Sequence, residues 1–208
     1  MKKSRYTILT SIALMLCLGL ESARAADPSV QPEASKSTAD LIGDLKKTSQ
    51  ASSDPQLKSL GDDLGSKSAS LSKSLGNNPK TQAVLQSALT SVLGNRGPAA
   101  LNSLQQLSQA KLTPEQTGLA KDVYHTGSAF LVQKNLGSVE GSQTEVAQVV
   151  SSLRKGNMTG TVAPLKSIGQ NSKLTQPQKD FVSSLTDHYA PGLKKAGGVF
   201  KSIPGLSK

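Results

Sequence analysis

The sequence predicts an all-α fold, a small helical bundle built from repeated helical units that follow a cleaved signal peptide. Three observations support this prediction. Apolar residues recur at spacings of three and four over long stretches, as they do on one face of an amphipathic helix. Ser, Thr, Asn or Asp precedes a Pro or a capping-box partner where several of these stretches begin. Finally, the motif KLT-x-x-Q occurs twice, at 111–116 and at 173–178.

The N-terminus has the three parts of a secretory signal peptide. Residues 1–5 are basic, residues 6–20 are apolar, and 23–25 form an A-x-A cleavage site. The apolar run is short for a membrane span, so cleavage is favoured over an uncleaved anchor. We therefore expect Sec-type export and removal of residues 1–25. The mature chain would then begin at Ala26, contain no transmembrane segment and be periplasmic or secreted.

Composition limits the chemistry of the mature chain. Cys17 is the only cysteine and lies in the signal peptide, so cleavage would remove every thiol that could form a disulfide or bind a metal. Lipoprotein signals have a small residue before their cysteine, whereas Leu16 precedes Cys17. Aromatic residues make up 3% of the chain, so any core is aliphatic. Residues 141–208 carry a net charge of +6, which favours an anionic partner unless it serves only solubility.

The first part of the mature chain is predicted to contain a leader and one degenerate unit. Residues 26–37 contain two prolines and scattered polar residues, and we expect a disordered leader there. Two helices follow, at 38–47 and at 55–76, the second with leucines along one side. Together they form a first unit, residues 38–77, that lacks a short middle helix.

Two more units of similar order are predicted at 78–137 and 142–200. Each has a first helix that ends at a Gly-Asn turn, a short second helix, and a longer third helix that begins in the KLT-x-x-Q motif. Chance similarity between Leu-rich helices is the alternative to duplication. The single all-α domain would span 38–203, with a frayed tail at 204–208. The expected helices lie at 81–93, 98–107 and from Thr113, then at 144–153, 162–169 and from Thr175, with capping boxes at Thr113…Gln116, Ser142…Glu145 and Thr175…Gln178.

The third helices are predicted to be amphipathic, with Leu119 and Phe181 as their first inward residues. Glycines inside the predicted helices each cost about 1 kcal/mol relative to Ala, which close helix packing can offset. The apolar stripes are Leu119, Val123, Phe130 and Leu131 in one helix and Phe181, Leu185, Tyr189, Leu193 and Ala196 in the other, and the glycines are Gly61, Gly65, Gly118, Gly127, Gly197 and Gly198.

No catalytic constellation is evident, and we predict no catalytic residue, metal or cofactor. His125 and His188, the only histidines, lie at related places in the last two units. One hypothesis joins them with Asp122 and Asp187 in a metal site between the units. Structural roles are favoured because the sequence has no i, i+4 histidine pair and no HExxH motif.

Sequence-specific binding of nucleic acid is also disfavoured. Arg96 and Arg154 are the only arginines outside the signal peptide, whereas Arg is the commonest reader of bases. Aromatic side chains that could stack on bases are scarce. A nonspecific contact between lysines and phosphates stays open.

The segment 191–203 is the most suggestive candidate for function. As a helix it would place apolar residues on one face and lysines beside it, as in segments that lie on anionic membranes. The alternative, which we prefer, is that this face belongs to the end of the last packing helix, because Gly197 and Gly198 weaken an isolated helix. The candidate contacts to an anionic surface are Lys194, Lys195, Phe200 and Lys201.

These observations favour an exported, non-catalytic helical protein that binds or scaffolds another envelope protein, or one outside the cell. A cationic binder of anionic lipid, lipopolysaccharide or another polyanion is the second hypothesis. An enzyme is the third.

Overall fold

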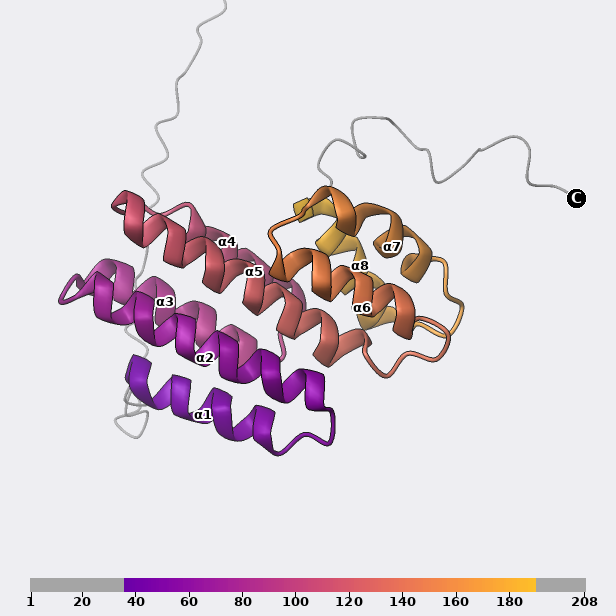
Figure 1. The fold of residues 1–208 in the computed structure, drawn as a ribbon, viewed down its shortest axis with the longest axis horizontal. Helices are drawn as coiled ribbons and strands as arrows, with labels where there is room; N and C mark the ends of the chain where they lie inside the picture. The colour runs from indigo at the N-terminus through magenta and orange to yellow at the C-terminus, as the bar shows by residue number, and fades with distance from the viewer. Residues whose placement is uncertain (1–35, 190–208) are drawn as a thin grey trace, which may run out of the picture. The chain divides into compact units, whose positions relative to one another are not determined.

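A computed structural model describes residues 36–189, which form eight α-helices and no strand. The all-α prediction is therefore confirmed for the described residues. The helices belong to one compact unit, and Figure 1 shows their arrangement. The signal peptide, nearly all of the leader and the segment 191–203 lie outside the described residues. The helices are α1 Thr38–Gln50, α2 Pro55–Leu75, α3 Pro79–Leu93, α4 Gly97–Ser108, α5 Pro114–Leu136, α6 Gln143–Arg154, α7 Thr159–Gly169 and α8 Gln176–Tyr189.

Side-chain caps fix several of the helix starts that the sequence indicated. Ser37 and Asp40 form a reciprocal capping box at α1, in which each side chain accepts from the backbone N–H of the other residue. Thr113 and Gln116 form the same box at α5. Such boxes satisfy backbone donors that a helix start leaves without partners.

The predicted capping box at Ser142 and Glu145 was wrong. Ser142 has φ −122° and ψ 4°, outside the extended region that a capping residue needs, and its side chain does not cap α6. Its hydroxyl accepts a hydrogen bond from Asn171 instead, at 2.7 Å. The Ser167 hydroxyl donates to Glu145 across the α6–α7 interface at 3.5 Å. These residues therefore fasten neighbouring segments together rather than starting a helix.

The prediction of a one-sided amphipathic α5 was also wrong. Leu119 is only half-buried, whereas Ala120, Val123, Tyr124 and every residue of 126–132 are buried. The cause is the position of α5, which packs against α2, α4 and α6 at once (Figure 1). A helix that is covered on several sides needs buried residues around most of its circumference.

Two glycines, one inside α2 and one at the first position of α4, lie where a neighbouring helix comes close. A Cβ on Gly61 of α2 would collide with Ser49 of α1, and a Cβ on Gly97 of α4 would lie 2.6 Å from the Phe181 ring of α8. Both glycines thus allow a neighbouring helix to approach closely, as the sequence analysis anticipated for Gly61. That packing can offset the helix-propensity cost of glycine, which is about 1 kcal/mol.

Six helices follow α2: α3, α4 and α5 lie within 78–137, and α6, α7 and α8 lie within 142–200. The first helices, α3 and α6, end alike. The backbone N–H of Arg96 donates to the carbonyl of Ser91, five positions earlier in the chain. The backbone N–H of Asn157 donates in the same way to the carbonyl of Ser152. The residue before each donor has positive φ, 52° at Asn95 and 66° at Gly156. Both ends are therefore Schellman motifs. Superposition of the two segments stays a prediction.

The repeated KLT-x-x-Q motif makes a contact that the sequence did not reveal. Gln116 donates from Nε2 to the carbonyl of Ser74 at 2.8 Å, and Gln178 donates to the carbonyl of Asn135 at 2.9 Å. Ser74 and Asn135 are each the next-to-last residue of a helix, α2 and α5. Carbonyls in a last turn lack partners within their own helix. At α8 the predicted capping box is only half formed, because Gln178 accepts from the backbone N–H of Thr175 while the Thr175 hydroxyl donates to Gln178 Oε1 rather than accepting from the Gln178 backbone. Each glutamine also caps the end of an earlier helix, and we call these two contacts the glutamine bridges.

Candidate functional site

The candidate contacts to an anionic surface lie outside the described residues; they are Lys194, Lys195, Phe200 and Lys201. The sites that follow are therefore built from residues 36–189. They are the surroundings of the two histidines, a buried tyrosine pair, and a groove between α6 and α7.

The histidines do not form the hypothetical metal site. His125 lies on α5 with its ring edge-on to Tyr124, at 5.4 Å between centroids, and against the backbone of Leu153. His188 lies on α8, with Nδ1 2.8 Å from the carbonyl of Ser184. Residues 36–189 contain no group of three or more His, Cys, Asp or Glu side chains that could hold a metal ion. His125 is thus engaged with the backbone of α6, and His188 with the backbone of its own helix.

Burial lowers the pKa of His125 below its usual value of 6.5. The Leu153 backbone and the Asp122 carboxylate oppose this shift, while Lys121 and Lys67 add to it. Gly156 lies close to this ring, since a Cβ there would be 3.3 Å from Cε1. His125 is therefore a neutral packing residue between α5 and the end of α6 near neutral pH.

A pair of buried tyrosines joins α5 to α8. The rings of Tyr124 and Tyr189 lie 5.7 Å apart between centroids, at 35° to each other. Burial is the main cause that raises the pKa of both phenols, and that of Tyr189 lies well above its ordinary value. Tyr189 Oη and the neighbouring Ser128 Oγ are buried without a hydrogen bond of good geometry. The pair therefore holds two helices together as neutral rings. The sequence did not predict this contact, because Tyr124 and Tyr189 are 65 residues apart.

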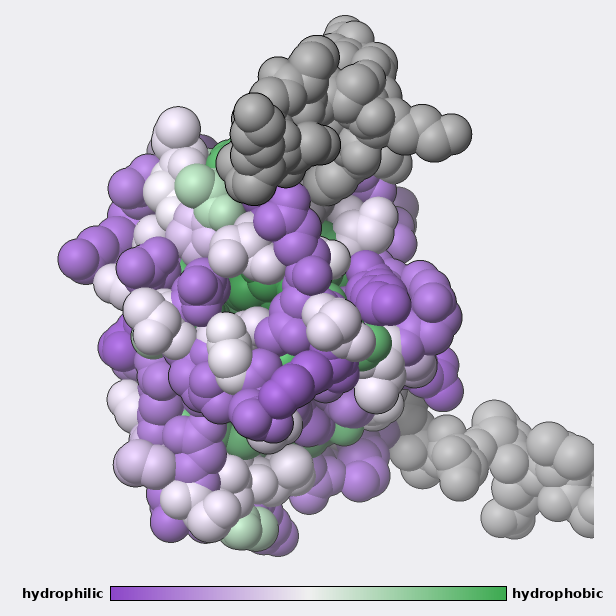
Figure 2. Space-filling view, turned by 90° about the vertical axis from the view of Figure 1, so that its right-hand side faces the viewer, coloured by the Kyte–Doolittle hydropathy of each residue, from purple (hydrophilic) through white to green (hydrophobic). Residues whose placement is uncertain are grey.

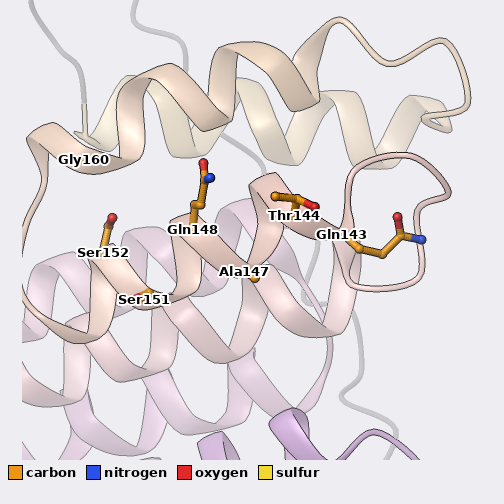
Figure 3. Close-up of a pocket in the computed structure, with 7 residues that line it drawn as sticks. All are labelled: Gln143, Thr144, Ala147, Gln148, Ser151, Ser152 and Gly160. Atoms are coloured by element: carbon orange, nitrogen blue, oxygen red, sulfur yellow. The ribbon is translucent and has the colours of Figure 1, made fainter.

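An open groove runs along the outer face of α6 beside α7, and Figure 3 shows its lining. Its volume is about 730 Å³, and it opens widely to solvent. In this view Gln148 and Ser152 point from α6 toward α7, while Gly160 lies at the start of α7. The lining consists of Gln143, Thr144, Ala147, Gln148, Ser151 and Ser152 of α6, with Gly160 of α7.

Close contacts at both ends of the groove set the spacing of its walls. At one end, a Cβ on Gly160 would lie 2.8 Å from both the Ser152 hydroxyl and Asn157 Nδ2, so glycine at this position lets the start of α7 lie close to α6. At the other end, the Ser167 hydroxyl donates to Glu145, and Asn171 donates to Ser142. The groove is thus part of the packed fold.

Five of the seven lining residues have uncharged polar side chains, and none has an ionisable one. Gln can both donate and accept hydrogen bonds, as can Ser and Thr hydroxyls. Within residues 36–189, the side chains of Thr144, Gln148 and Ser151 make no hydrogen bond to protein. The sequence held a weak signal for this surface, since the polar positions of 143–152 are uncharged apart from Glu145.

The surrounding surface is also polar. Figure 2 shows the face that includes the α6–α8 end as mostly hydrophilic, with hydrophobic residues visible in narrow furrows. Among residues 36–189, the apolar side chains that are exposed belong to Ala and Pro only. Within the same range, no helix has the length and hydropathy that a membrane crossing requires. Comparison with known proteins found no matching family model, no similar curated protein and no similar solved structure.

Proposed function

We propose that this protein is an exported, non-catalytic helical module that binds another protein of the bacterial envelope or of the extracellular space. The observation that carries the proposal is the α6–α7 groove, an open and uncharged surface with hydrogen-bonding side chains that make no bond within the described fold. Such a surface suits recognition, because it offers donors and acceptors without a reactive group.

The proposed export rests on the signal peptide pattern of residues 1–25. Mass spectrometry of the exported protein should find Ala26 at the N-terminus. An intact Met1, or a lipid on Cys17, would contradict export with cleavage at the A-x-A site.

Affinity capture from envelope extract tests the binding proposal. The mature chain, tagged at one end, is incubated with extract in 0.1 M and in 1 M salt, where the Debye length is about 10 Å and about 3 Å. A partner that binds through the uncharged groove should stay bound at high salt. The proposal fails if no protein is enriched over a tag-only control at either salt concentration.

A second candidate function is a cationic binder of anionic lipid, lipopolysaccharide or another polyanion. The observation that favours it is charge: residues 190–208 contain Lys194, Lys195, Lys201 and Lys208 and no acidic residue. Each Lys near an anionic surface contributes about 1 kcal/mol, so binding would be reversible and salt-sensitive.

Sedimentation with vesicles tests this second candidate. The mature protein should pellet with vesicles of anionic lipid and not with neutral ones. Truncation after Tyr189 and the double change Lys194→Glu/Lys195→Glu should both abolish pelleting. Equal pelleting with both vesicle types, or no loss on truncation, would exclude the membrane role.

A further inference from the structure

We propose that Tyr124 and Tyr189 form an oxidative cross-linking site, at which a one-electron oxidant joins the two rings by a carbon–carbon bond. This inference is independent of the proposed binding function. It rests on three observations: the contact between the two rings, their burial inside the fold, and the absence of competing side chains from the mature sequence.

The two rings lie in direct contact between α5 and α8. Their centroids are 5.7 Å apart and their planes meet at 35°. This separation falls within the range of about 4.5–7 Å that is usual for aromatic pairs. The Tyr189 hydroxyl also lies next to the hydroxyls of Tyr124 and Ser128. Phenoxyl radicals couple through the ring carbons beside the carbon that bears the oxygen, so neighbouring hydroxyls bring the reacting carbons together.

Burial favours coupling within one molecule over coupling between molecules. Tyr124 is 9% exposed and Tyr189 is 7% exposed, so the phenols of two folded molecules have little surface through which to meet. The oxidant itself does not need to touch the rings, because an electron can leave a buried phenol by transfer through the protein. A radical formed on one ring therefore has the other ring as its nearest partner.

The composition of the chain directs oxidation to this pair. Outside residues 1–25 the sequence contains no cysteine and no tryptophan, and Tyr124 and Tyr189 are its only tyrosines. Thiols, indoles and phenols are the protein side chains that give up one electron most readily. In that part of the chain a one-electron oxidant thus finds two such donors, and the fold places them in contact with each other.

The reaction removes two electrons and two protons from the protein. Each phenol gives one electron to the oxidant and its hydroxyl proton to water, which leaves two phenoxyl radicals. The radicals form one bond between ring carbons ortho to their oxygens, and the hydrogens on those two carbons then move to the oxygens and restore both hydroxyls. With a photo-excited ruthenium complex as the electron acceptor, persulfate takes up the two electrons and becomes two sulfate ions.

Oxidation of the dilute, folded mature protein with the ruthenium complex, persulfate and light tests the site. We expect a monomer that is lighter by two hydrogen atoms and has the blue fluorescence of dityrosine. A digest should contain the peptides of Tyr124 and Tyr189 joined to each other. The product should unfold at a higher urea concentration than the untreated protein, because the bond joins residues 65 positions apart and restricts the unfolded chain.

Denatured protein and two variants provide the controls. In urea that unfolds the protein, the yield of the intramolecular product should fall about ten-fold or more, because only the fold holds the rings together. Tyr124→Phe and Tyr189→Phe each keep the ring and remove one phenol, so both should give no intramolecular product. Circular dichroism establishes that the variants fold, which we expect because Tyr189 Oη makes no hydrogen bond of good geometry.

Three results would overturn the inference. One is that the folded protein forms no dityrosine under conditions that couple a blocked tyrosine, N-acetyltyrosine amide, in solution. Another is that the folded and the denatured protein give the intramolecular product in equal yield. The third is that cross-linked dimers of the folded protein outweigh the cross-linked monomer.

Discussion

The glutamine bridges should contribute measurably and nearly equally to stability. Gln178→Ala removes the bond to the Asn135 carbonyl and two bonds that Oε1 accepts from Thr175, at 3.0 Å and 3.1 Å. A hydrogen bond contributes about 0.5–1.5 kcal/mol net, and Gln178 is only partly buried, so we expect a loss of about 1–3 kcal/mol. Gln116→Ala breaks the corresponding bonds to Ser74 and Thr113, and should cost a similar amount.

Urea denaturation of the mature protein, followed by circular dichroism, measures these losses. Lys179→Ala is the control, because this neighbouring side chain is exposed and its loss should change the free energy of unfolding by no more than about 0.5 kcal/mol. Gln178→Glu separates the two roles of Gln178. The carboxylate can still accept both bonds from Thr175 but cannot donate to Asn135, so the loss that persists should be that of the one bond to Asn135, about 0.5–1.5 kcal/mol. If Gln178→Ala is no more destabilising than Lys179→Ala, the bridge has no energetic role.

Three other changes test the packing and the electrostatics. Phe181→Ala should lower the free energy of unfolding by about 3–5 kcal/mol, because the Phe181 residue is 2% exposed. Leu119→Ala should lower it clearly less, because Leu119 is only half-buried. Equal losses in urea denaturation would contradict this order. Gly97→Ala should destabilise the fold despite the better helix propensity of Ala, because the added Cβ would lie 2.6 Å from the Phe181 ring. A higher melting temperature for this variant would contradict the close contact. His125 has a lowered pKa when folded, so its stabilising contribution should be complete above about pH 6.5 and decline as the pH falls below that value. The stability difference between the parent and His125→Gln should therefore narrow between pH 7 and pH 5, as read from melts across that range.

The sequence predicted the helices well because their signals are local. A capping side chain bonds to backbone groups within the same helical turn. The starts of α1, α2 and α5 can therefore be predicted from the sequence without knowledge of tertiary contacts. The same rule failed at Ser142, where a contact from Asn171, 29 residues away, engages the hydroxyl. Leu119 was misjudged for a similar reason, because burial around α5 depends on which helices surround it.

The candidate binding surface was not predictable in the same way. A groove requires two helices at a fixed spacing, and that spacing depends on Gly160 against Ser152 and on Ser167 against Glu145. The hydrophobic periodicity of a helix does not indicate which of its residues will contact a residue of another helix. The glutamine bridges were hidden likewise, because the motif shows the capping box but not the distant carbonyl that Nε2 reaches.

Photo-crosslinking in cells tests most directly whether the protein binds a partner through the α6–α7 groove. A photo-reactive amino acid is placed at Ala147 in one strain and at Ala83, an exposed residue of α3, in another, with the signal peptide retained, and each strain is irradiated. The account predicts a discrete higher-mass product from position 147, formed with one envelope or secreted protein, and none from position 83. No product from position 147, or the same products from both positions, would contradict it.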